Sequence, residues 1–164
     1  MCIRDRIENT KAIFGIICAP ISTQIWLGSK FNISSNEETL PDSLRIVMSK
    51  SHQTDQDKMF LDYLNSLKVS YEIIEKGSSL KLCALADNKA DIYPRFGLTS
   101  EWDIAAGHAI LHANGGSISQ MANKEALRYS KEESILNPPF VAFRNKAIKD
   151  QYLPILSEFY KKLV

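Results

Sequence analysis

The sequence predicts an α/β layered domain over residues 41–164, preceded by a few strands within residues 7–40. Strand-like and helix-like segments alternate after residue 41, which is typical of helices that cover a mostly parallel or mixed sheet. Residues 101–113 carry apolar side chains at the i, i+3, i+4, i+7 spacing of a core-facing helix. The chain has 164 residues, of which 45% are hydrophobic and 24% charged, as expected for one globular domain with a core.

The charge balance excludes a strong field over the whole molecule. With 20 basic and 19 acidic residues, the formal net charge is +1. We therefore expect no nucleic-acid partner, and any site that binds anions must be local. No apolar run approaches the roughly 20 residues that cross a bilayer, so no transmembrane segment is expected. We expect a cytoplasmic location, and a peripheral association with the inner membrane stays open as an alternative.

The cysteines do not form a recognisable framework. There are three of them, Cys2, Cys18 and Cys83. An odd number at these spacings matches neither a set of disulfides nor a structural zinc site. We expect buried free thiols, as in a protein of a reducing compartment.

The first 40 residues have a strand-rich pattern. Residues 1–6 run almost directly into a strand-like segment and resemble translated adapter sequence, so we expect them to be a non-native leader. Strands are expected at residues 12–19, 24–27 and 30–33, with a turn after Pro20. The polar composition that follows places a boundary near residues 35–43.

Strands and helices then alternate to the end of the chain. A capping residue, Thr54 or Asp55, precedes a helical pattern, and Gly77 precedes another. Because proline is tolerated in the first turn of a helix, we expect the terminal helix to begin at Pro154. The expected strands are residues 44–49, 69–74, 90–96, 117–120, 127–129 and 141–144, and the other expected helices follow residue 54 and span residues 78–87 and 101–113.

Two of these helices have apolar faces that we expect to be buried. In the helix after residue 54 the face is formed by Met59, Phe60, Tyr63, Leu64 and Leu67. In the helix of residues 101–113 it is formed by Trp102, Ala105, Ala106, Ala109, Ile110 and Ala113.

Asp103 is the first candidate for chemistry. It follows a strand and a short loop and lies in the first turn of a helix, where free backbone N–H groups attract anions. A carboxylate there could hold a divalent cation against a bound phosphate. The alternative is that Ser100 or Asp103 only caps the helix, which is the commoner arrangement.

Three further segments could place cationic or polar groups at strand ends. Arg95 lies at the end of an apolar strand, where its guanidinium could hold a phosphate or form a surface ion pair. Ser78 and Lys81 begin a helix after Gly77, although the spacing is not that of a Walker loop and Ser78 could be an ordinary cap. His52 follows another strand. In an open α/β sheet such ends meet at one edge, so we expect a pocket for a ligand with more than one phosphate.

His108 and His112 lie four residues apart on one helix, a spacing found in metal sites. Neither a neighbouring glutamate nor a third ligand is evident. We therefore interpret both as packing or surface histidines.

The segment from Tyr93 to Ala109, Y-P-R-F-G-L-T-S-E-W-D-I-A-A-G-H-A, resembles the C-terminal signature of the inositol monophosphatase superfamily. More narrowly, it is similar to the CysQ-type 3′(2′),5′-bisphosphate nucleotidases. The resemblance covers about residues 8–143, and the W-D-x-A-A-G motif is highly specific. Residues 15–20, 49–52, 77–83 and 136–140 match in order.

The resemblance implies the C-terminal α/β domain of that fold, with residues 7–40 as remnant strands of its N-terminal α+β domain. It implies Mg²⁺-dependent removal of the 3′-phosphate from adenosine 3′,5′-bisphosphate, giving AMP, a step that clears a by-product of sulfate assimilation. Carried over by position, Asp103 would bind Mg²⁺ and lie near the scissile phosphate. Arg95 would bind a phosphate of the nucleotide, and Ser78, Lys81 and His52 would line its site.

The chain departs from the family pattern in its acidic residues. The family holds most of its metal ions with an acidic pair and a D-P-x-D-G-T segment, and this sequence has neither. We therefore expect a fragment that lacks the N-terminal half of its own fold and is inactive alone. Two alternatives stay open, an inositol monophosphatase and a non-catalytic nucleotide-binding piece, and residues 144–164 have no counterpart in the resemblance.

Overall fold

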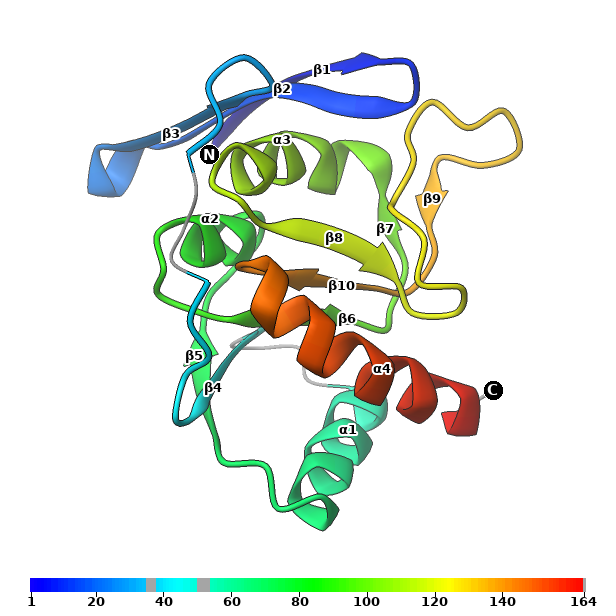
Figure 1. Ribbon diagram of the computed structural model, residues 1–164. Helices are drawn as coiled ribbons and strands as arrows, with labels where there is room; N and C mark the ends of the chain where they lie inside the picture. The colour runs from blue at the N-terminus through cyan, green and yellow to red at the C-terminus, as the bar shows by residue number, and fades with distance from the viewer. Residues whose placement is uncertain (35–37, 50–53, 164) are drawn as a thin grey trace.

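Two larger sheets and four α-helices of the described residues are stacked in layers in the computed structural model (Figure 1). The structure describes residues 1–34, 38–49 and 54–163. A three-stranded sheet covers one side of helices α2 (Leu80–Ala86) and α3 (Glu101–Ala113), and a five-stranded sheet lies on their other side. Helices α1 (Asp55–Ser66) and α4 (Lys146–Leu163) cover the outer face of the five-stranded sheet. The predicted α/β layered class is confirmed.

The three-stranded sheet is antiparallel and has the order β1-β2-β3. Its strands are β1 (Cys2–Glu8), β2 (Lys11–Ala19) and β3 (Gln24–Ser29), and the 3₁₀ turn Pro20–Ser22 joins the last two as predicted. Two glycines let the sheet lie directly on α3. A Cβ atom on Gly15 would stand 2.1 Å from the Ala106 carbonyl oxygen, and one on Gly28 would stand 2.3 Å from the Ile110 Cα.

The five-stranded sheet is mixed, with the order β5-β4-β6-β10-β8. Strand β4 runs parallel to β5 and β6, and β10 is antiparallel to both β6 and β8. Side chains alternate between the two faces, because successive residues of a strand point in opposite directions. The strands are β4 (Leu44–Met48), β5 (Tyr71–Glu75), β6 (Ile92–Arg95), β8 (Ser117–Gln120) and β10 (Phe140–Phe143), and a short pair is formed by β7 (Thr99–Ser100) and β9 (Leu136–Asn137).

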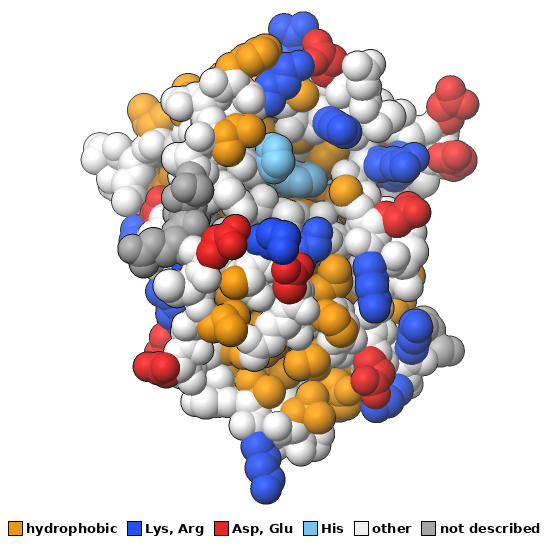
Figure 2. Space-filling model, viewed as in Figure 1, with side chains coloured by type: hydrophobic (Ala, Val, Ile, Leu, Met, Phe, Trp, Pro, Cys, Tyr) orange, Lys and Arg blue, Asp and Glu red, His pale blue; other side chains and the backbone are white. Residues whose placement is uncertain are grey.

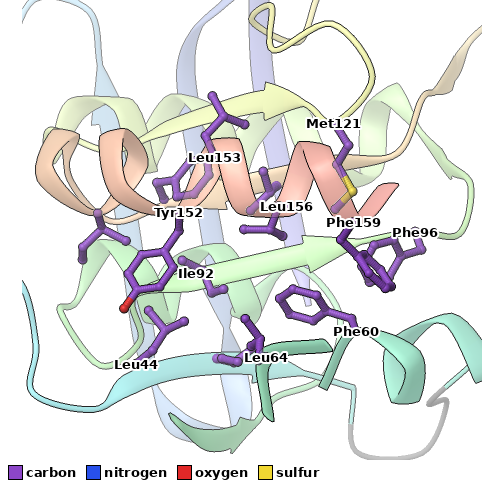
Figure 3. Packing of buried hydrophobic residues seen from close by; sticks show 14 of the residues in the cluster. Leu44, Phe60, Leu64, Ile92, Phe96, Met121, Tyr152, Leu153, Leu156 and Phe159 are labelled. Atoms are coloured by element: carbon purple, nitrogen blue, oxygen red, sulfur yellow. The ribbon is translucent and has the colours of Figure 1, made fainter. Parts of the chain in front are cut away.

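The largest apolar cluster lies between this sheet and helices α1 and α4 (Figure 3). Phe60 of α1 and Phe159 of α4 have ring centroids 5.5 Å apart, and Phe96 lies within 5.7 Å of Phe60. Leu44 and Ile92 meet the same cluster from the sheet. This contact buries one face of the predicted C-terminal domain.

Three predicted elements are wrong. Residues 30–33 do not form a strand, because the chain turns back after β3 and Asn32 only bridges to Ser29. Residues 127–129 do not extend the sheet, since the Tyr129 amide donates to the Thr10 carbonyl in the β1–β2 turn. The terminal helix begins at Lys146 and not at Pro154.

Several side chains expected to be buried are exposed. Trp102 is 59% exposed, Met59 51%, and Leu67, which follows the end of α1, 45%. Of the cysteines, all free, only Cys83 is buried, while Cys2 is exposed because it lies at the edge of the outer sheet. The conformation of β1 does not test the prediction that residues 1–6 are a non-native leader, and the domain limits likewise stay predictions. Among the described residues, no helix is long and apolar enough to cross a membrane.

A buried carboxylate joins three strands at the amino end of β6. Asp91 is fully buried and accepts hydrogen bonds from the Arg45 guanidinium at 2.8 and 2.9 Å and from Arg144 Nε at 2.9 Å. It also accepts from the Arg45 backbone N–H at 2.8 Å. Burial raises the pKa of Asp91, but the hydrogen bonds from Arg45 and Arg144 outweigh it and hold the pKa below its ordinary value.

Helix α4 continues through Pro154, which is exposed in its middle. A proline in a helix interior removes one backbone hydrogen bond and costs about 3 kcal/mol relative to alanine. Here buried side chains on both sides of it, among them Tyr152 and Leu156, hold the helix together. We expect Pro154→Ala to raise the free energy of unfolding by about 1–3 kcal/mol, measured by urea denaturation. An unchanged or lowered free energy would show that the helix is already adapted to the proline.

Candidate phosphate-binding site

A cavity of about 200 Å³ lies beyond the carboxyl end of β6, between the first turns of α2 and α3. The crevice beyond the carboxyl ends of parallel strands is the usual ligand position in open α/β sheets. Four of the five residues proposed from the sequence line this cavity: Ser78, Lys81, Arg95 and Asp103. The fifth, His52, lies outside the described residues. Their roles in binding stay predictions.

Arg95 is the last residue of β6 and lines two adjoining cavities. Its Nε atom is buried and has no hydrogen-bond partner among the described residues. Its Nη2 atom lies 3.5 Å from the Leu98 carbonyl oxygen, at the outer limit of a hydrogen bond. The alternative of a surface ion pair is therefore not seen in the described part of the chain, and the guanidinium can offer donors to an anion.

Lys81 lies in the first turn of α2 and is 6% exposed. Its Nζ atom is 5.5 Å from the centroid of the Tyr93 ring and 3.5 Å from the Ser78 carbonyl oxygen. Burial lowers the pKa of Lys81, and the positive charge of Arg95 lowers it further. Two cations thus share a small space, and a bound anion would relieve both effects.

Asp103 lies in the first turn of α3, and its side chain partly caps that helix. Its Oδ2 atom accepts a hydrogen bond from the Ser100 backbone N–H at 2.9 Å, as the capping alternative requires. The Ser79 hydroxyl donates to the Asp103 carbonyl oxygen at 3.2 Å and so ties α2 to α3. The residue is nonetheless exposed and lines the cavity, so the cap and a ligand can share the carboxylate.

The described residues do not by themselves form a magnesium site. Mg²⁺ takes six oxygen ligands in near-octahedral geometry, usually with one or two carboxylates and several waters. Asp103 is the only carboxylate that lines the cavity within the described part of the chain. In the same residues no group of three or more His, Cys, Asp or Glu side chains could hold a metal ion. Asp103 is therefore a possible single ligand that needs partners.

The sequence analysis missed Tyr93. Its ring lies under Lys81 and lines both cavities, and burial raises its pKa to about 12, so it stays a neutral phenol. The sequence contained an indication of this position, because Tyr93 and Arg95 are two residues apart on one strand and their side chains therefore lie on the same face of the sheet. His108 is a packing histidine, as interpreted from the sequence, since its Nδ1 atom lies 2.8 Å from the Tyr129 hydroxyl.

Comparison with known proteins agrees with this arrangement. The family model described as "Inositol monophosphatase family" matches residues 6–159. The chain belongs to the inositol monophosphatase family. That membership confirms the resemblance carried by the W-D-x-A-A-G segment of α3.

Individual members of the family are similar over most of this chain. The 3′(2′),5′-bisphosphate nucleotidase CysQ of Salmonella typhimurium is 34% identical over 142 residues, which cover 82% of this chain and 56% of the relative. CysQ of Escherichia coli K12 is 32% identical over the same shares. The crystal structure of CysQ from Bacteroides thetaiotaomicron superposes with a TM-score of 0.75 at 30% identity, covering 85% of this chain and 61% of that one. The chain spans about half the length of the curated relatives it matches.

Proposed function

We propose that this chain supplies the nucleotide-binding part of a 3′(2′),5′-bisphosphate nucleotidase, a phosphoric monoester hydrolase. The proposed substrate is adenosine 3′,5′-bisphosphate, and the products are AMP and phosphate. The similarity to CysQ enzymes supports the reaction class. A dependence on Mg²⁺, a role in sulfate assimilation and a cytoplasmic location belong to the same proposal and rest on the family resemblance.

One observation carries the choice of substrate. The cavity holds two cations, Lys81 and Arg95, and only one carboxylate, Asp103. A nucleotide with two phosphates brings two separate anionic groups, which suits two cationic side chains better than a single phosphate does. In this arrangement the planar guanidinium of Arg95 donates hydrogen bonds to one phosphate, and the ammonium group of Lys81 forms an ion pair with the other.

The same observation disfavours the inositol monophosphatase alternative. A sugar alcohol with one phosphate needs acceptors for its hydroxyl groups, and the candidate site offers one carboxylate. Asp103 is the one acid that the described residues place in this cavity, and one of the two cations of the site would then have no phosphate to bind. Such a charge is costly at a half-enclosed site.

We expect the chain to bind adenosine 3′,5′-bisphosphate more tightly than AMP or inositol 1-phosphate, by about tenfold or more. Removing one phosphate should remove one charge-assisted contact. Arg95→Gln and Lys81→Gln should each weaken bisphosphate binding by about tenfold, because each variant keeps a polar side chain and deletes one charge. Isothermal titration calorimetry on the purified chain measures all of these affinities.

Exposed cations elsewhere provide matched controls for these variants. Arg128→Gln and Lys76→Gln delete one charge each at positions that do not line the cavity, so affinity should stay unchanged. Equal affinities for inositol 1-phosphate and the bisphosphate would contradict the nucleotide assignment. Equal effects of the site and control variants would mean that the anion is attracted only by overall charge.

A further inference from the structure

A second cavity, of about 260 Å³, lies along the C-terminal half of α3, between that helix, the β1–β2 turn, β8 and the start of α4. Figure 2 shows histidine side chains on this face, with hydrophobic side chains beside them and a group of basic and acidic side chains below them. No residue lines both this cavity and the candidate phosphate-binding site. The lining residues with polar side chains are Lys11, His108, His112, Ser117 and Lys149, and the apolar walls are Ala12, Ile118, Ala126 and Leu127.

Lys11 and Lys149 are the lysines that line this cavity. No carboxylate is among its lining residues within the described part of the chain. Three lysines outside the lining are in ion pairs: Lys146 with Asp150 at 2.7 Å, Lys131 with Glu101 and Lys30 with Glu8. Lys11 and Lys149 have no ion-pair partner among the residues that the structure describes.

The start of α4 adds to this positive field. The first turn of that helix carries no acidic residue and two lysines, of which Lys146 is paired with Asp150 and Lys149 is in no ion pair among the described residues. The N-terminus of a helix is the positive end of its dipole, so lysines are unfavourable there and an anion is favourable. Lys149 is half-buried with its unpaired charge beside this helix end.

His108 can contribute a hydrogen bond without adding charge. Its Nδ1 atom is engaged with the Tyr129 hydroxyl at 2.8 Å, and burial lowers its pKa to about 3, so the ring is neutral. When the tyrosine donates to Nδ1, the ring proton resides on Nε2, which is then a donor. His112, one turn later on the same helix, lines the same cavity.

We propose that this second cavity is a binding site for a small organic anion with a compact apolar body, such as an aromatic carboxylate. Lys11 and Lys149 hold the anionic group, and Ile118 and Leu127 contact the body. The ammonium groups of the two lysines would stabilise the carboxylate of such a ligand. The aliphatic side chains offer no polar partner and would contact its apolar body. The site is distinct from the candidate phosphate-binding site and needs none of its residues.

The test uses 4-fluorobenzoate as the probe, observed by ¹⁹F NMR in the presence of the purified chain. We expect saturable broadening of the probe signal and no comparable binding of the neutral 4-fluorobenzamide. Lys149→Gln and Lys11→Gln should each weaken binding by about tenfold, because each removes one charge-assisted contact. These two residues come from different elements, so a folding failure in one variant leaves the other informative.

Two controls separate this site from the rest of the molecule. Lys146→Gln removes a lysine from the same turn of α4 that is already paired with Asp150, and it should leave probe binding unchanged. Arg95→Gln should also leave it unchanged. If Arg95→Gln lost probe binding while Lys11→Gln and Lys149→Gln retained it, the probe would be bound at the phosphate-binding site, and the proposal would be overturned. Equal binding of the neutral amide, or no saturable binding, would overturn it as well.

Discussion

We expect residues 1–164 to release no phosphate from adenosine 3′,5′-bisphosphate in the presence of Mg²⁺. Hydrolysis with two metal ions needs several carboxylates to place the ions and activate a water molecule. The candidate site offers Asp103 alone among the described residues, and the sequence contains no Asp-Pro pair from which a D-P-x-D-G-T segment could come. A colorimetric phosphate assay should therefore give the rate of the blank with either the nucleotide or inositol 1-phosphate.

The full-length CysQ of Escherichia coli provides the positive control for this assay. The decisive variant is Asp103→Ala. Phosphate release by the chain that disappears in this variant would refute the prediction and show that one carboxylate suffices. Release that persists in the variant would come from a contaminating phosphatase. Binding without release, in contrast, is the behaviour expected of a nucleotide-binding piece.

We expect Asp91→Asn to lower the free energy of unfolding by about 3–5 kcal/mol, the usual cost of breaking a buried ion pair from one side. The substitution leaves Arg144, which is 3% exposed, without its carboxylate, and it also weakens the contacts of Arg45. Urea denaturation of the variant and the parent measures the difference. Asp62→Asn, on the exposed surface of α1, is the matched control and should change the free energy by less than about 0.5 kcal/mol.

The same carboxylate should make stability depend on pH. The folded-state pKa of Asp91 lies below its ordinary value, so the folded chain binds this proton less readily than the unfolded chain. The stabilisation is then fully present above the unfolded pKa, near 3.8, and is lost as the pH falls through the lower, folded value. Asp91→Asn should remove this part of the acid sensitivity. An equal loss of stability toward low pH in the variant and the parent would assign the effect to other carboxylates.

Much of the candidate site could be predicted from strand and helix boundaries. Arg95 ends a strand, whereas Ser78, Lys81 and Asp103 begin helices or precede them directly. In an α/β sheet with parallel neighbours these positions meet at one edge, so their convergence on one cavity required no knowledge of packing. The capping role of Asp103 was also open to prediction, because the contact with Ser100 spans only three residues.

Other features depend on contacts between distant segments. Asp91, at the amino end of β6, serves the stability of the sheet and not the site, because Arg45 of β4 and Arg144, which follows β10, both donate hydrogen bonds to it. The helix through Pro154 exists because buried residues on both of its sides pack against α1 and the sheet. Local propensity favours a helix start at that proline, and tertiary burial outweighs it.

The sequence by itself determined the α/β class, the family and the four groups that gather at the end of β6, because hydrophobic periodicity and a specific motif are local properties of the chain. The tertiary structure alone decided that Lys81 lies buried over Tyr93 beside an Arg95 nitrogen with no hydrogen-bond partner among the described residues, and that two lysines and two histidines share a second cavity. The physical reason is that burial and the lack of a charge partner depend on what surrounds a side chain in space, and those neighbours come from segments far apart along the chain.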